Sequence, residues 1–143
     1  MSPDDFIALR KLKGKQILTD IEFVQHKDLS PHVVAFDDAE VDNSMGLGVV
    51  ASGQYNRKTG RTTFCFTLEG RGQICRVCVN GAIHGDAGRT HKHELRDEAD
   101  IGELPHAVPR PDLAGKTPKE IWEIICRNAR IDHVGNFTDP SGE

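Results

Sequence analysis

Residues 46–80 decide the fold, and they read GLGVVASGQYNRKTGRTTFCFTLEGRGQICRVCVN. Three apolar runs of strand length lie in this stretch, at 46–55, 61–69 and 73–80, and short polar or glycine-containing loops separate them. Because so few residues join consecutive runs, the strands must form antiparallel hairpins. A further extended run at 89–95 (RTHKHEL) is expected to pair with the strand at 73–80. The pattern predicts an antiparallel meander of about four or five strands.

One helix is expected before this meander in the sequence and another after it. The N-terminal segment offers a capping serine, a proline and two acids at 2–5, which predicts a short helix that ends near Gly14. Thr117 and Glu120 form a capping box that begins a C-terminal helix, whose apolar stripe would pack on the sheet. The remaining expectations are a strand at 15–24, an irregular stretch at 25–45, a loop at 102–116 and a loose tail at 134–143. The predicted class is α+β, in a single domain over 1–143.

Composition narrows the possible functions. The 143 residues carry 37% hydrophobic and 28% charged side chains, which fits one ordinary globular domain and excludes disorder, collagen and coiled coil. A formal charge of −4 excludes a global positive field that would hold nucleic acid non-specifically. With no signal-peptide pattern at the N-terminus, we expect a cytoplasmic protein whose four cysteines are reduced.

Two histidines at spacing two mark the candidate site. Side chains alternate across a strand, so His91 and His93 should share one face of the sheet. On the preceding strand, alternation places Ile74, Arg76, Cys78 and Asn80 on a common face. His84 lies in the connecting loop. If the hairpin register sets Arg76 beside the histidine pair, a fixed cation and three imidazoles form an anion site.

Such a group suits cleavage of a phosphodiester. One imidazole can take a proton from an attacking hydroxyl while another protonates the leaving oxygen, and Arg76 can hold the phosphoryl oxygens. RNA is the natural substrate because its 2′-OH supplies the nucleophile, so no metal or other cofactor is expected. The predicted catalytic residues are Arg76, His84, His91 and His93, and the predicted substrate-binding residues are Arg57, Lys58, Arg89 and Lys92.

Metal binding is the chemical alternative. His-x-His on a strand is a good two-ligand unit, and His84 or Cys78 could complete three ligands with a position open for water. The candidate ligands are therefore His84, His91, His93 and Cys78. Cys75-x-x-Cys78 does not fit a zinc knuckle, because spacing three within a strand sends the two thiols to opposite faces.

The run from Arg76 through Asn80-Gly81 to His84, followed by His91-Lys92-His93, resembles the pattern R-x-D-x-N-G-x-x-H and H-x-H of small prokaryotic proteins similar to TumE-type toxins of toxin–antitoxin modules. The resemblance covers about residues 54–130. It implies a compact α+β protein of the RelE-like kind that cuts RNA without metal, in a phage or mobile-element setting, with Arg76, His84, His91 and His93 as the functional set. The aspartate of the pattern is replaced here by Cys78.

Three functions therefore remain open. The first is a toxin-type, metal-independent endoribonuclease whose partners are RNA or an antitoxin protein. The second is a non-catalytic phage or mobile-element inhibitor of the anti-defence or anti-CRISPR kind, whose acidic surface binds a host defence protein complex. The third is a metal-dependent hydrolase that uses the same histidines. None of the three requires a membrane.

Overall fold

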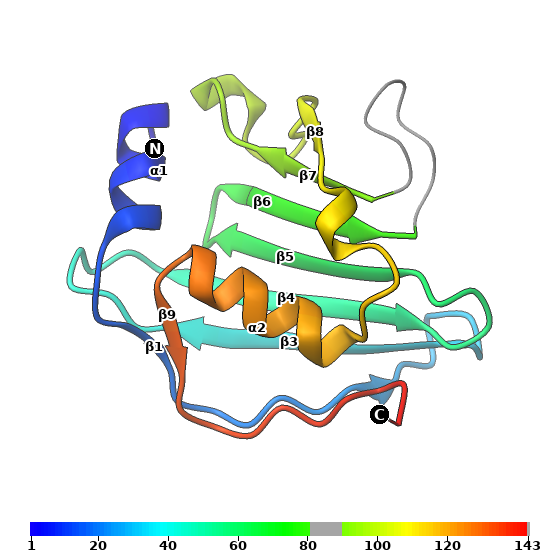
Figure 1. The fold of residues 1–143 in the computed structure, drawn as a ribbon. Coiled ribbons are helices and arrows are strands. Elements are labelled where there is room, and N and C mark those ends of the chain that lie inside the picture. Colours follow the sequence, from blue (N-terminus) through cyan, green and yellow to red (C-terminus); the bar gives the residue numbers. More distant parts are fainter. Residues whose placement is uncertain (81–89, 143) are drawn as a thin grey trace.

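A computed structural model describes residues 1–80 and 90–142. They form an α+β fold in which two α-helices accompany a seven-stranded antiparallel sheet (Figure 1). Along the sheet the strands are β2 (Val24–Gln25), β3 (Val33–Val41), β4 (Val49–Asn56), β5 (Thr62–Leu68), β6 (Gly72–Val79), β7 (His91–Glu94) and β8 (Ala107–Pro109). A separate parallel pair joins β1 (Lys15–Ile17) to β9 (Ile131–His133). The helices are α1 (Pro3–Lys11) and α2 (Pro118–Asn128), with short 3-10 turns η2 (Glu98–Asp100) and η3 (Pro111–Leu113).

The predicted class is confirmed, but the predicted number of strands is too low. The stretch expected to be irregular contains β3, whose alternation is interrupted where the β3–β4 register shifts between Phe36 and Ala39. Asp38 has a φ of 56° there, so the extra residues form a bulge that hides the strand from a period-two search. The single strand expected at 15–24 is wrong as well, since only β1 and the first residue of β2 fall within it. The loop expected at 102–116 contains the edge strand β8.

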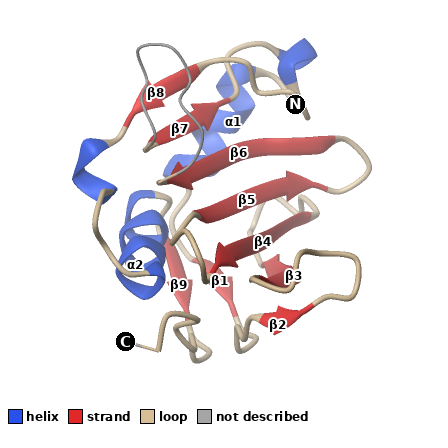
Figure 2. Ribbon diagram, turned by 90° about the vertical axis from the view of Figure 1, so that its right-hand side faces the viewer, coloured by secondary structure: helices blue, strands red, loops and turns tan. Residues whose placement is uncertain are grey.

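Helix α2 covers one face of the sheet. Figures 1 and 2 show it lying against the strands, and its capping box of Thr117 and Glu120 forms as the sequence predicts. Its Trp122 is 2% exposed and packs with the ring centroids of Phe64 at 5.2 Å and Phe36 at 5.9 Å. Aromatic burial of this kind supplies much of the free energy that holds a helix on a sheet. This face of the sheet is therefore structural.

The C-terminal segment is not the loose tail that we expected. Phe137 bridges to Ile21 in a parallel pair, and Thr138 N donates to the Ile21 carbonyl. The Phe137 ring also stacks on Trp122 at a centroid distance of 5.7 Å. Hydrophobic periodicity did not predict this contact, because a single aromatic residue, Phe137, makes it.

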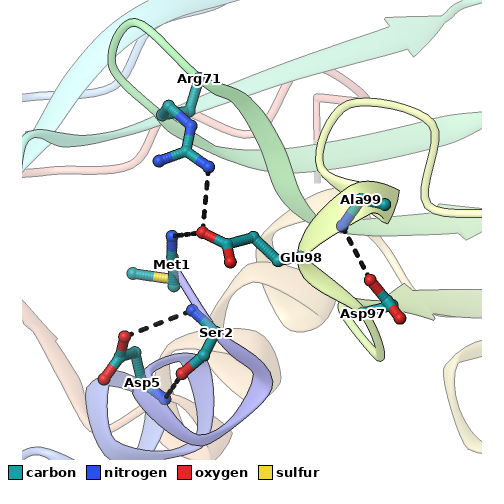
Figure 3. A network of polar contacts seen from close by, with 7 residues as sticks. All are labelled: Met1, Ser2, Asp5, Arg71, Asp97, Glu98 and Ala99. Carbon is teal, nitrogen blue, oxygen red and sulfur yellow. Dashed lines mark hydrogen bonds and ion pairs between the residues drawn. The ribbon is translucent and has the colours of Figure 1, made fainter.

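The chain's first residues are joined to the β5–β6 turn and to η2 (Figure 3). The Met1 amine lies 2.9 Å from Glu98 Oε1, which also accepts from Arg71 Nη2 at 3.3 Å. Ser2 and Asp5 form the capping box that begins α1. Hydrogen bonding from the terminal amine, and then from Arg71, lowers the pKa of the Glu98 carboxyl. The network positions α1 at one end of the sheet.

None of the helices in residues 1–80 and 90–142 is long and apolar enough to cross a membrane.

Candidate metal centre

Three buried side chains converge on the face of the sheet opposite α2. A ligand atom from each of Cys78, His91 and His93 lies within 4.8 Å of the other two. Cys78 is 4% exposed, His91 0% and His93 3%. The two imidazole rings meet edge to face with their centroids 4.8 Å apart. Within the described residues, no other group of three such side chains comes this close together.

Strand register places these residues together. Cys78 of β6 is directly opposite His91 of β7, and Arg76 is opposite His93. Side chains of opposed residues in an antiparallel pair stand on the same face with their Cβ atoms about 5 Å apart. His93 joins the same face because it follows His91 by two residues. The prediction that His91 and His93 share a face, with Arg76 on the strand beside them, is confirmed.

A backbone carbonyl fixes the orientation of one imidazole. His93 Nδ1 lies 2.7 Å from the carbonyl oxygen of Leu104, which can only accept, so Nδ1 carries the proton. In the neutral ring the lone pair is therefore on Nε2. Leu104 is itself fully buried, and its N–H donates to Asp100 O. Donation of the second ring nitrogen to a carbonyl is the usual arrangement around a metal-binding histidine.

A set of one thiol and two imidazoles suits zinc. Zinc binds cysteine sulfur at about 2.3 Å and histidine nitrogen at about 2.0–2.1 Å, in tetrahedral geometry. Those bond lengths would hold the ligand atoms about 3.3–3.6 Å apart. The widest separation in the cluster must then shorten by about 1 Å, a movement that small rotations of the side chains can supply. Three protein ligands leave one tetrahedral position for water or substrate.

The thiols of the Cys-x-x-Cys pair face opposite ways, as the sequence predicts. Cys75 lines an apolar pocket beneath the two helices, while Cys78 belongs to the histidine cluster. Lys92, however, lines the same helix-side pocket as Cys75. Lys92 therefore alternates to the face of β7 opposite His91 and His93, and its role in substrate binding stays a prediction.

A bulge in β6 corrects a second expectation. The β5–β6 register shifts between Phe66 and Thr67, so that Ile74 is an extra residue. Ile74 lines the helix-side pocket together with Cys75, and it does not share the face of Arg76 and Cys78. The bulge returns Gln73 to the face of Arg76, where Gln73 Oε1 accepts from Arg76 Nη1 at 2.8 Å. Sequence reasoning missed Gln73, because strict alternation separates residues at spacing three.

Arg76 lies beside the centre and lines a groove of about 310 Å³ over β3–β6. Its cross-strand partners are His93 on one side and Cys65 on the other. Burial raises the pKa of the Cys65 thiol to about 12, and the nearby Arg76 guanidinium opposes that shift.

Arg57 and Lys58, which the sequence predicts to bind substrate, are exposed in the β4–β5 turn. His84 and Arg89 lie outside the described residues.

Burial of the histidines bears on the acid–base reading. A general acid or base must come within hydrogen-bonding distance of the substrate. His91 and His93, at 0% and 3% exposed, present almost no surface for that contact. A ligand role needs only that the ring nitrogens reach a common ion, so burial is compatible with metal binding.

Comparison with known protein families, with curated proteins and with solved structures finds no match. The fold and the site therefore define the class: an α+β protein with a candidate Cys-His-His centre on the face of the antiparallel sheet opposite α2.

Proposed function

We propose that the protein is a metal-dependent hydrolase whose zinc ion is bound by Cys78, His91 and His93. The observation that carries the proposal is the convergence of these three buried side chains, with ligand atoms within 4.8 Å of one another. One thiolate and two neutral imidazoles are a donor set that zinc accepts, and three protein ligands leave a fourth position for water.

The chain's own residues would perform separate tasks. Cys78 binds as a thiolate, and its negative charge offsets half of the charge of the ion. His91 and His93 would bind as neutral imidazoles, and the Leu104 carbonyl, which accepts from Nδ1 of His93, leaves Nε2 of that ring to bind the ion. When bound, zinc lowers the pKa of a water in its fourth position to about 7, which supplies hydroxide at neutral pH.

Burial favours this function over metal-free ribonuclease activity. In a metal-free ribonuclease two imidazoles that are 0% and 3% exposed must each touch RNA, whereas at a zinc centre only the fourth position of the ion must open to water and substrate. Replacement of the aspartate of the toxin pattern by Cys78 points the same way, since a thiolate is a strong zinc ligand. Toxin-type RNA cleavage stays a prediction that the same experiment addresses.

The test compares two cysteines of one strand. Protein purified without chelator is assayed for zinc content, and cobalt is then exchanged into the site so that the thiolate-to-metal charge-transfer band can be measured. Cys78→Ser should lose both the metal and the band. Cys75→Ser is the matched control, because it makes the same change three residues away on the opposite face, and it should keep both.

Hydrolysis is measured on a chromogenic phosphodiester and on RNA, with and without chelator. The proposal expects activity that the chelator removes and that added zinc restores. Loss of metal in both cysteine variants, or equal retention in both, would overturn it. RNA cleavage that persists in chelator and disappears in His91→Gln would overturn it in favour of the metal-free ribonuclease. Circular dichroism of each variant shows whether the fold is retained, and zinc titration of the chelator-treated wild type tests the site with no substitution.

A further inference from the structure

The groove that Arg76 lines contains two arginines and one carboxylate. Arg61 and Arg76 both line it, and the acid is Asp37. The carboxylate of Asp37 contacts a residue outside the groove lining, because its Oδ2 lies 3.2 Å from Nε2 of His26. Cys65 adds no negative charge, because its raised pKa keeps the thiol protonated at neutral pH. The groove is therefore locally cationic in a protein whose formal charge is −4.

A hydrogen bond to Gln73 orients Arg76 in the groove. A guanidinium has five N–H donors, and within the described residues one bond is formed, from Nη1 to Gln73 Oε1 at 2.8 Å. That bond depends on the β6 bulge, which puts Gln73 on the same face. Hydroxyl and amide side chains line the same groove, among them Ser52, Thr63 and Gln54. Oriented guanidinium and hydroxyl donors are the groups that bind phosphate oxygens.

The groove adjoins the candidate metal centre. Thr63 lines the groove and is the cross-strand partner of Cys78, while Arg76 is the partner of His93. Opposed residues of neighbouring strands have side chains about 5 Å apart, so a group bound by Arg76 lies on the same face as the ligands and one strand away. At about 310 Å³, the groove is at the small end of the range of ligand pockets.

We infer that this groove binds the phosphate group of a phosphodiester, with Arg76 as its principal anchor and Arg61 as a second cation. The inference rests on the proposed hydrolase function, and it names the substrate class of that site. Hydrolysis of such a substrate forms a P–O bond to the water oxygen and breaks the P–O bond to the leaving alkoxide, which takes up the proton of the water. No oxidant, reductant or further co-reactant is needed.

The experiment titrates inorganic phosphate into chelator-treated, ¹⁵N-labelled protein and follows backbone amide shifts. Because no metal is present, the result does not depend on zinc binding. We expect shifts concentrated in β4, β5 and β6. Arg76→Gln should weaken binding about tenfold or more, which corresponds to about 1.4 kcal/mol. Arg76→Lys should restore part of the affinity, because a lysine keeps the charge but not the forked geometry.

The control for charge is Lys92→Gln, which removes the same positive charge from the adjacent strand on the opposite face. It should leave phosphate affinity unchanged within about twofold, since screening and distance weaken its field at the groove. Equal losses in Arg76→Gln and Lys92→Gln would overturn the inference, because binding would then follow net charge alone. Absence of saturable binding in the wild type would also overturn it.

The two proposals can fail separately. If phosphate binds through Arg76 while the chain retains no zinc, the hydrolase proposal fails and the phosphate site remains. If zinc binds through Cys78 while Arg76→Gln leaves the phosphate affinity unchanged, the metal centre remains and its assigned substrate class is wrong.

Discussion

The two faces of the central sheet differ in what they bury. The face under α2 carries aromatic rings, with Trp122 in contact with rings from β3 and β5. The other face carries a thiol, two imidazoles and an arginine-lined groove. Strand β6 contributes to both faces, because its Cys75 lies on one and its Cys78 on the other. Because side chains alternate along a strand, one segment can supply core residues to one face and candidate site residues to the other.

The comparison predicts that the helix-covered face holds most of the stability. Trp122 is 2% exposed, and its Nε1 donates to His133 Nδ1 at 3.1 Å. Trp122→Ala should lower the free energy of unfolding by about 3–5 kcal/mol through lost burial and a residual cavity. Urea unfolding followed by circular dichroism measures the change. Glu123→Ala, at an exposed position of the same helix, should change it by less than about 0.5 kcal/mol. A cost below about 1 kcal/mol for Trp122→Ala would contradict the assignment.

A glycine on β4 shows how tightly the aromatic face is packed. A Cβ added at Gly53 would lie 2.5 Å from Cε1 of Phe36 and 3.0 Å from Cδ1 of Phe64. Gly53→Ala should therefore destabilise the fold by about 1–3 kcal/mol, because both rings must shift within a packed core. The melting temperature measures this effect. Unchanged stability would mean that the rings have room to turn, and the contrast in packing between the faces would be weaker than described.

Two cysteines away from the histidine cluster sharpen the contrast in reactivity. Burial raises the pKa of Cys65 and of Cys126 to about 12. At pH 8 their thiolate fraction is then about one in ten thousand, so iodoacetamide should leave both unmodified in the folded protein. Between about pH 9 and pH 12 the folded state keeps protons that the unfolded thiols have lost, so these groups make stability fall as pH rises. Peptide mapping after a brief labelling pulse tests this, and rapid modification of either thiol at pH 8 would contradict it.

The smallest effect is expected at the β4–β5 turn. Arg57 and Lys58 are exposed there, and Asn56 Oδ1 holds the turn by accepting from the Lys58 and Thr59 amides. The double variant Arg57→Ala/Lys58→Ala should change the free energy of unfolding by less than about 0.5 kcal/mol. It should also change phosphate affinity by no more than about twofold. Calorimetric titration with phosphate measures the second effect, and a tenfold loss would move the anion site from Arg76 to the turn.

Periodicity was enough to predict the centre of the fold. Clear apolar runs and short loops gave β4, β5 and β6 and their antiparallel pairing, and the capping box of Thr117 gave α2. The shared face of His91 and His93 followed from spacing two. These features depend on local sequence, which a linear pattern records directly.

Bulges and long-range contacts account for most of what the sequence did not predict. The bulges at Asp38 and Ile74 break the period on which strand detection relies, so β3 and the place of Gln73 were missed. The hydrogen bond from His93 to Leu104 joins residues eleven apart through the fold, and no spacing rule predicts it. Burial of the histidines likewise depends on tertiary packing. That burial changed the favoured chemistry from proton transfer to metal binding.

The most direct test of the metal centre is X-ray absorption spectroscopy at the zinc edge on protein loaded with one equivalent of zinc. The account predicts a first shell with one sulfur at about 2.3 Å and two imidazole nitrogens at about 2.0–2.1 Å, completed by one further light atom. Cys78→Ser should lose the sulfur, while Cys75→Ser should keep it. A shell of oxygen and nitrogen alone in the wild type, or a sulfur that survives in Cys78→Ser, would contradict a centre built from Cys78, His91 and His93.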